Sequence, residues 1–451
     1  MPCGTNGDKL MEIKVVKFGG SSLADAAQFK KVADIILADK SRKFVVASAP
    51  GKRFKDDVKV TDMLYECYAK ASKGGDIDDA FEAIKNRFNS IIADLGLNFD
   101  LSKEYEIIKN CFLGRAGRDY AASRGEYLNS KILAKYIGFD FLDAAEYIFF
   151  DESGKFNLDA TTKALSKKLS EVEHAVIPGF YGSMPNDTIK TFSRGGSDIT
   201  GSIVARAAKA ELYENWTDVS GILVCDPRIV DNPNVIEIVT YRELRELAYM
   251  GFTVLHEDAI FPVRTAGIPI NIRNTNQPEA AGTMIVADAG EVKSNLIITG
   301  IAGKKGFSVI HIEKDMMNSE LGFGRKVLEA LENCGVSFEH LPSGIDTMSI
   351  IVNTSELSGK QDEVIAAIRR AVSPDNVYIE DDLALIAVVG RGMKETRGTA
   401  GRIFSALAHA HVNVRMIDQG SSELNVIVGV HESDFELATK SVYEMFALSA
   451  E

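Results

Sequence analysis

The chain has 451 residues, 45% of them hydrophobic and 25% charged, which is typical of a globular protein with about two to four domains. Its net charge of −13 argues against a general nucleic-acid binder, because such proteins need a basic surface. No stretch approaches the roughly 20 apolar residues of a membrane span, and residues 1–10 lack the apolar segment of a secretory signal. The five cysteines are scattered without a CxxC pair, so we expect a cytoplasmic protein with no nucleic-acid or membrane partner.

Strand and helix signals alternate along the first two-thirds of the chain. Residues 12–18 and 44–49 are apolar runs typical of buried strands, and between them apolar residues from Phe29 to Ile36 recur at helical spacing. Further strand-like runs lie at 174–182 and 222–225. A helical pattern covers 198–210, and residues 70–134 look largely helical. The alternation predicts an α/β fold with helices on both faces of a parallel or mixed sheet, beside which 70–134 form an insertion.

Two segments near the C terminus repeat one another. Residues 327–352 align with 403–428 at a constant offset, so that Leu331 matches Leu407 and Ile351 matches Ile427. Each copy reads as strand, helix, strand, turn and strand, which indicates a small α+β unit. Two such units can cover each other's open sheet edges. The predicted domains are residues 11–295, 296–380 and 381–451.

Two Gly-Gly turns, each beside a cation and followed by a helix, indicate anion sites. "KFGGSS" begins with Lys17, and "SRGGSD" contains Arg194. Glycine lets backbone N–H groups approach a phosphate or carboxylate, and the cation supplies charge. The first motif alone fits a plain strand-to-helix turn about equally well, and the second fits a helix start capped by Ser197 or Asp198. Their joint presence is less readily explained by chance.

Two further motifs have both a structural and a functional interpretation. "WTDVSGILVCDPRIV" fits a turn-rich hairpin, or a nucleotide pocket with Asp218 near the ribose or base and Arg228 near phosphate. In "ASRGEYLNSKIL", Glu126 alone is as well explained by a solvated glutamate at a helix start. Walker A, GxSxG and HExxH motifs are absent, which argues against a P-loop protein, a serine hydrolase of the GxSxG type or a zinc hydrolase.

In combination, "KFGGSS", "RGE", "SRGGSD" and "TDVSGI…DPR" resemble the recurrent motifs of the aspartate kinases, and the doubled C-terminal unit resembles their tandem ACT domains. The resemblance runs from about residue 12 to the C terminus. It implies a three-layer α/β/α amino acid kinase domain followed by two ferredoxin-like ACT domains. It also implies transfer of a phosphoryl group from ATP to the side-chain carboxylate of L-aspartate. This reaction is the first step toward lysine, threonine, methionine and diaminopimelate.

The resemblance implies roles for single residues. Lys17 is expected to bind the transferring phosphoryl group, and Asp198 to orient Lys17 or help hold Mg²⁺. Arg194 is expected to bind a carboxylate of aspartate and Glu126 its ammonium. The nucleophilic carboxylate is already ionised at pH 7, so the site needs positioning and positive charge rather than a general base. The expected ATP-site residues are Lys17, Phe18, Gly19, Gly20, Ser21, Thr217, Asp218, Leu223, Arg228, Thr253 and Val254, and the expected aspartate-site residues are Ser48, Thr61, Glu126, Arg194, Gly195, Gly196 and Ser197.

Two positions depart from the family pattern. Leu223 occupies a position where many relatives have a tyrosine, and Thr253 one where many have a lysine. The expected ATP site therefore lacks one cation, and we expect Lys17 to carry more of the phosphate charge.

The tandem ACT units imply a feedback effector bound between subunits, and so a homodimer or a dimer of dimers. The expected pocket lies between the loop before the first ACT helix and the strand after it. Two carboxylates there, Glu320 and Glu339, favour L-lysine, with L-threonine as an alternative or co-effector; the other interpretation is that both carboxylates are simply solvated. The full set is Met317, Ser319, Glu320, Gly322, Phe323, Gly324, Ser337, Phe338 and Glu339.

Two other functions stay open. One is a kinase of the same fold acting on another amino-acid carboxylate, and the ACT pair and "SRGGSD" count against it. The other is a catalytically inactive amino-acid sensor, against which the intact Lys17, Arg194 and Asp198 count.

Overall fold

The computed structural model describes residues 12–193, 195–252, 255, 257–288 and 297–447. The chain forms two compact units. The first contains the chain up to residue 222 together with 237–241 and 254–290, and the second contains 223–236, 242–253 and 291–451. Residues 223–236 and 242–253 thus group with the C-terminal unit, although they precede the predicted domain boundary at residue 295.

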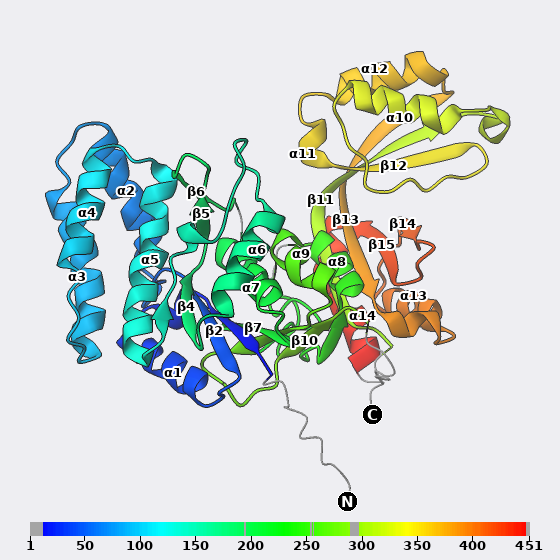
Figure 1. Cartoon of the computed structure of the whole chain (residues 1–451). Coiled ribbons are helices and arrows are strands. Elements are labelled where there is room, and N and C mark those ends of the chain that lie inside the picture. The colour runs from blue at the N-terminus through cyan, green and yellow to red at the C-terminus, as the bar shows by residue number, and fades with distance from the viewer. Residues whose placement is uncertain (1–11, 194, 253–254, 256, 289–296, 448–451) are drawn as a thin grey trace, which may run out of the picture. The chain divides into compact units, whose positions relative to one another are not determined.

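An eight-stranded sheet forms the centre of the first unit (Figure 1). The strand order is β3-β4-β2-β1-β7-β9-β10-β8, and every neighbouring pair is parallel except β9 with β10. Parallel neighbours need crossover connections, which the alternating strand and helix signals supply. The strands are β1 (Lys14–Phe18), β2 (Arg42–Ala47), β3 (Asp140–Phe141), β4 (Ala175–Pro178), β7 (Leu212–Thr217), β8 (Ile238–Thr240), β9 (Ile270–Asn274) and β10 (Thr283–Val286).

Helices cover both faces of this sheet, which confirms the predicted α/β architecture. On one face, apolar side chains of α1 to α5 share a core with Phe18, Val45 and Trp216. On the other face, α7 packs against β1, β2 and β7. The helices are α1 (Ala26–Leu37), α2 (Val60–Ser72), α3 (Asp78–Asp94), α4 (Ser102–Leu113), α5 (Arg118–Ile137), α6 (Leu158–Leu169), α7 (Gly196–Ala207) and α9 (Glu257–Ala266), and a small hairpin joins β5 (Tyr181–Ser183) to β6 (Ile189–Thr191).

The first predicted strands and helices are present, and residues 70–134 are largely helical as expected. The α1 helix begins where the Asp25 side chain accepts a hydrogen bond from the Gln28 N–H, a normal N-cap. The run 222–225 is an exception, because Leu223 makes only an isolated bridge with Val235. A turn in which the Asp226 carbonyl accepts from the N–H of Val230 follows at once and ends the extended segment.

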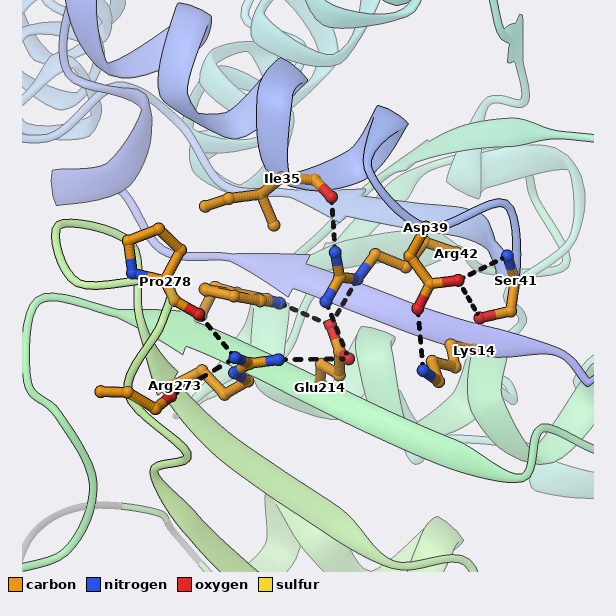
Figure 2. Close-up of polar contacts among 10 residues, drawn as sticks. Lys14, Ile35, Asp39, Ser41, Arg42, Glu214, Arg273 and Pro278 are labelled. Atoms are coloured by element: carbon orange, nitrogen blue, oxygen red, sulfur yellow. Dashed lines mark hydrogen bonds and ion pairs between the residues drawn. The ribbon is translucent and has the colours of Figure 1, made fainter.

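β7 has buried polar side chains on both faces. On the α1 face, the Glu214 carboxylate accepts from Arg42 Nε at 2.8 Å, while Arg273 approaches it from β9 at 3.9 Å (Figure 2). The Arg42 guanidinium also donates to the Ile35 carbonyl of α1. Removing one member of a buried ion pair costs about 3–5 kcal/mol, because the remaining charge is left uncompensated, so these contacts hold β2, β7, β9 and α1 in one arrangement.

The second unit contains a five-stranded antiparallel sheet in the order β12-β11-β13-β15-β14 (Figure 1). Its strands are β11 (Gly300–Glu313), β12 (Thr347–Asn353), β13 (Asn376–Val389), β14 (Met416–Asp418) and β15 (Asn425–His431). Its helices are α8 (Tyr241–Tyr249, whose first residue belongs to the first unit), α10 (Phe323–Asn333), α11 (Thr354–Leu357), α12 (Gln361–Val372), α13 (Thr399–His409) and α14 (Phe435–Ala447).

The internal repeat is visible in this sheet, because α10 and α13 are equivalent helices and β12 and β15 each pair with a long strand. Each repeat has its own apolar core. The two long strands β11 and β13 serve both cores. Ile310 of β11 packs in the first core, whereas Ile301 packs with the second repeat. The core of the second repeat therefore includes part of β11, which precedes the helices of the first repeat in the chain. The predicted domain boundary at 380/381 falls within β13. No helix within the described ranges has the length and apolar character needed to cross a bilayer.

Candidate active site

Lys17 lies near the carboxyl end of β1, the edge where open α/β sheets bind ligands. The residue is 7% exposed, and its side chain points to the α7 face, where Nζ lies 2.6 Å from Oδ1 of Asp198. The residue is therefore not a surface lysine beside a turn, which was the structural alternative for "KFGGSS". Its charge is held by a carboxylate on a neighbouring helix.

Asp198 occupies the first turn of α7. The N-cap position of this helix is Gly195, in a left-handed conformation with φ of 55°, and no side chain caps the helix. The prediction that Ser197 or Asp198 serves as the N-cap is therefore wrong, because the glycine turn itself starts the helix. The carboxylate of Asp198 is left to face β1 and β7.

Asn215 of β7 completes this cluster, although no motif pointed to it. It stands directly opposite Lys17 in the parallel β1–β7 register and is buried. Its Nδ2 donates to Asp198 Oδ1 at 2.9 Å, and its Oδ1 accepts from Lys17 Nζ at 3.4 Å. The sequence signal was one of several polar residues inside "YENWT", and nothing distinguishes Asn215 from the others until the strand is paired with β1.

The two glycines after Lys17 allow close contact between loops. A Cβ on Gly20 would lie 2.9 Å from the Ala49 carbonyl oxygen, and one on Gly51 only 2.6 Å from the carbonyl carbon of Gly20. A Cβ on Gly19 would lie 3.7 Å from Lys17 Nζ. The loops after β1 and β2 therefore meet beside the lysine, in contacts that a side chain at Gly20 or Gly51 would prevent.

Other expected ATP-site residues flank this loop in different ways. Phe18 is fully buried and stacks on Trp216, so its side chain faces the core and only its backbone is available to a ligand. Ser21 begins a short 3₁₀ turn after the glycines. Thr217 ends β7, where its carbonyl accepts from the Thr275 N–H, and its hydroxyl donates to Asp218 at 3.2 Å.

Leu223 and Arg228 belong to the second compact unit. The Arg228 guanidinium is largely exposed and pairs with Asp226 two residues earlier, which holds the pKa of that carboxyl below its usual range. Arg194, Thr253 and Val254 lie outside the described residues.

Glu126 is buried in α5, which contradicts its interpretation as a solvated glutamate at a helix start. Its Oε2 has no hydrogen-bond partner, and burial raises the pKa of this carboxyl to about 8 against the opposing effect of the Ala49 backbone. A Cβ on the adjacent Gly125 would lie 2.7 Å from the Ala49 Cβ, so α5 packs directly against the loop that also meets Gly20. A buried carboxyl with one unpartnered oxygen beside the Gly19–Gly20 loop is suited to a cationic ligand group.

The remaining expected aspartate-site residues surround the same loops. Ser48 is half-buried after β2, where its carbonyl accepts from Asn129 Nδ2 at 2.7 Å, and Thr61 is half-buried in the first turn of α2. Ser197 packs closely on Gly179, because a Cβ added to Gly179 would lie 2.6 Å from the Ser197 Oγ. Gly196 similarly packs against Phe180, because a Cβ added to Gly196 would lie 2.2 Å from the Phe180 ring.

The expected effector residues lie around the start of α10. Gly322 is the N-cap in a left-handed conformation, with φ of 79°. Glu320 is not free, because it pairs with Lys314 and with Lys326 Nζ at 2.7 Å. Glu339 accepts a hydrogen bond from the Tyr249 hydroxyl within the same unit. Of the others, Met317 and Phe323 are buried, Phe338 and Ser319 are exposed, Gly324 lies near Met348, and the Ser337 N–H donates to Glu356.

The described residues contain no cluster of three His, Cys, Asp or Glu side chains that could hold a metal ion by themselves. One carboxylate oxygen of Asp198 receives both Lys17 and Asn215. The second oxygen fits a magnesium ion whose other ligands come from nucleotide phosphates and water, the usual arrangement for Mg²⁺ at phosphoryl-transfer sites.

The sequence matches two family models, the amino acid kinase family over residues 12–274 and an ACT domain over residues 386–446. Aspartokinase 3 of Bacillus subtilis (strain 168) is 40% identical, over 96% of this chain and 98% of that protein. Chloroplastic aspartokinase 1 of Arabidopsis thaliana is 28% identical, over 96% of this chain and 80% of that protein.

Solved structures give the same result. Aspartate kinase of Clostridium acetobutylicum is 54% identical and superposes with a TM-score of 0.87, over 96% of this chain and 100% of that one. Escherichia coli aspartokinase III in complex with aspartate and ADP shares the fold at 23% identity, with a TM-score of 0.70 over 97% of this chain and 100% of that one. With the buried lysine–aspartate pair and the paired ACT units, these matches show that the chain belongs to the aspartokinase family.

Proposed function

We propose that this aspartate kinase transfers the γ-phosphoryl group of ATP to the side-chain carboxylate of L-aspartate, giving ADP and 4-phospho-L-aspartate. The observation that carries the proposal is the Lys17–Asp198–Asn215 cluster beside the Gly19–Gly20 loop. A buried cation beside a glycine loop at the carboxyl edge of the sheet supports binding of a phosphoryl group there.

The phosphoryl group is held by charge and geometry. Lys17 donates to the γ-phosphoryl oxygens, while the backbone around Gly19 and Gly20 accommodates them without steric conflict. Mg²⁺, with Asp198 as one ligand, would neutralise further phosphate charge when bound. Asp198 needs no role as a base, because the attacking carboxylate carries no proton at neutral pH. The site's contribution is to hold two anions in line and to offset their repulsion.

Aspartate is proposed to bind between α5 and the start of α7. Glu126 receives its ammonium, and this pairing offsets the burial of the carboxylate in its ionised form. Arg194 binds one of its carboxylates as a planar fork, beside Gly195 and Gly196. Ser48, Thr61 and Ser197 add hydrogen bonds.

The rest of the nucleotide is proposed to contact Thr217 and Asp218 at the end of β7. Ser21 and the Phe18 backbone complete the loop.

The ACT units are proposed to bind L-lysine as a feedback effector, with L-threonine as the alternative. Escherichia coli aspartokinase III, a protein of the same fold, has also been solved with lysine and aspartate. In this chain, Glu339 is the more suitable acceptor for a side-chain ammonium, because Glu320 is already bound by two lysines. We also propose that ACT units pair between subunits in a homodimer or dimer of dimers, and that the enzyme is cytoplasmic and supplies lysine, threonine and methionine synthesis.

Trapping of the acyl phosphate tests the reaction. Purified enzyme is incubated with ATP, Mg²⁺ and aspartate in the presence of hydroxylamine, which converts an acyl phosphate into a coloured hydroxamate. We expect hydroxamate from aspartate and none above background from glutamate. Hydroxamate from glutamate alone would identify a kinase for another amino acid, and none from either would identify an inactive sensor.

A further inference from the structure

Asn215 is a buried amide whose two ends both serve the phosphate-binding cluster. Its side chain shares the α7 face with Lys17, while the adjacent Glu214 points to the opposite face and is bound by Arg42. The residue is 3% exposed, so burying its amide would be costly without partners. Both partners it finds are charged groups of the proposed site, Asp198 and Lys17.

The contacts limit how the Lys17 ammonium can point. An ammonium has three N–H donors and no acceptor. One is directed to Asp198 at 2.6 Å and one toward Asn215 Oδ1 at 3.4 Å. The third remains for a ligand, and Gly19 has no side chain beside the ammonium, since even a Cβ there would lie 3.7 Å from Nζ.

The contacts also limit how strongly Asp198 holds the lysine. Asn215 Nδ2 donates to the same carboxylate oxygen, Oδ1, that pairs with Lys17. A shared acceptor oxygen binds each donor less strongly than it would bind one alone. The amide thus fixes the position of the carboxylate and weakens its competition with a phosphoryl group for the ammonium.

We propose that Asn215 is a positioning residue for phosphoryl transfer: it holds Asp198 and Lys17 so that one lysine N–H faces the transferring group. The proposal rests on the function proposed above and extends it to a residue that no family motif indicates.

The first test compares Asn215→Leu with a matched control, Asn271→Leu. Asn271 lies on the neighbouring strand β9 opposite Glu214, and so on the other face of the sheet. Loss of hydrogen bonds to charged groups predicts a fall in kcat of about tenfold or more for Asn215→Leu, with KM for aspartate within about twofold of wild type. Asn271→Leu is expected to retain kcat within about twofold. Equal kcat values for wild type and a folded Asn215→Leu would overturn the proposal.

A double-mutant cycle separates positioning from general support of the fold. If Asn215 acts through Asp198, then adding Asn215→Leu to Asp198→Asn lowers kcat little further, because the group it positions has already changed. Independent effects that multiply would overturn the proposal. Asp198→Asn is assayed with saturating ATP so that kcat rather than nucleotide affinity is compared.

Asn215→Asp provides an isosteric variant. Its carboxylate lacks the N–H donor that Asn215 gives to Asp198. We expect its kcat to fall as in Asn215→Leu, and a kcat equal to that of wild type would count against the proposal. A wild-type enzyme inactive with aspartate would instead refute the proposed function, so the two failures are distinguishable.

Discussion

Glu126 makes aspartate binding dependent on pH. Burial raises the pKa of this carboxyl to about 8 in the absence of ligand, so most molecules carry a neutral Glu126 at pH 7. The ammonium of aspartate binds the ionised form of Glu126. About one tenth of the enzyme is ionised at pH 7 and about half at pH 8, and apparent affinity scales with the competent fraction. We therefore expect KM for aspartate to fall about fivefold between pH 7 and pH 8.

The assay measures ADP release at saturating ATP and varied aspartate from pH 6.5 to 8.5, a range in which the aspartate ammonium stays protonated. Glu126→Gln is the matched variant. Loss of a charge-assisted hydrogen bond predicts a KM raised about 10- to 100-fold, and the slope with pH should disappear. The KM for ATP, measured on the same samples, serves as the internal control. A wild-type KM for aspartate that is flat with pH, or a slope that persists in Glu126→Gln, would refute the role of this carboxyl.

The Glu126 carboxyl also makes the stability of the folded chain depend on pH. Its pKa in the folded chain lies above its ordinary value of 4.5, so the folded state binds more protons than the unfolded state between these values. The stability that Glu126 contributes is fully present below pH 4.5 and is lost as the pH rises through about 8. Melting curves of apo enzyme should show that Glu126→Gln loses less stability than wild type between pH 6 and 8.5.

Three further outcomes follow from the structure. Lys17→Ala should lower kcat about 100- to 1,000-fold with little change in KM for aspartate, whereas Lys14→Ala, on the same strand, should stay within about twofold; a change in KM alone would contradict the phosphate role. Glu214→Gln should lower the free energy of unfolding by about 3–5 kcal/mol, measured by urea denaturation, because the buried Arg42 and the partly buried Arg273 lose their counter-charge. Glu339→Ala should abolish inhibition by lysine with activity nearly intact, while Glu329→Ala on α10 keeps it; a wild type insensitive to millimolar lysine would exclude this effector.

Much of the fold was predictable, because it follows from hydrophobic periodicity. The strand at Lys14–Phe18 is an apolar run, the helix after it has a period of 3.6, and the repeat was visible from matched positions such as Leu331 and Leu407. The sharing of β11 and β13 between two repeats was not predictable, because a strand of 14 residues has the same pattern whether it serves one core or two. The prediction of a strand at 222–225 failed for a related reason, because the apolar character of a segment does not show whether it has a partner strand.

The site was only partly predictable. Residue types and glycine turns indicated Lys17 and Asp198, but they also allowed a helix cap, and only the left-handed Gly195 distinguishes the two. The burial of Glu126 depends on how closely a glycine lets α5 approach the β2 loop. The role of Asn215 depends on its register with β1, a relation between residues 198 positions apart that no local pattern contains.

The most direct measurement is coupled ADP release by the wild-type enzyme with aspartate and with glutamate, side by side, at saturating ATP and Mg²⁺. The account predicts rapid release that depends on aspartate, near-background release with glutamate, and loss of the aspartate-dependent rate in Lys17→Ala. Release that is equal with either amino acid, absent with both, or unchanged in Lys17→Ala would contradict it.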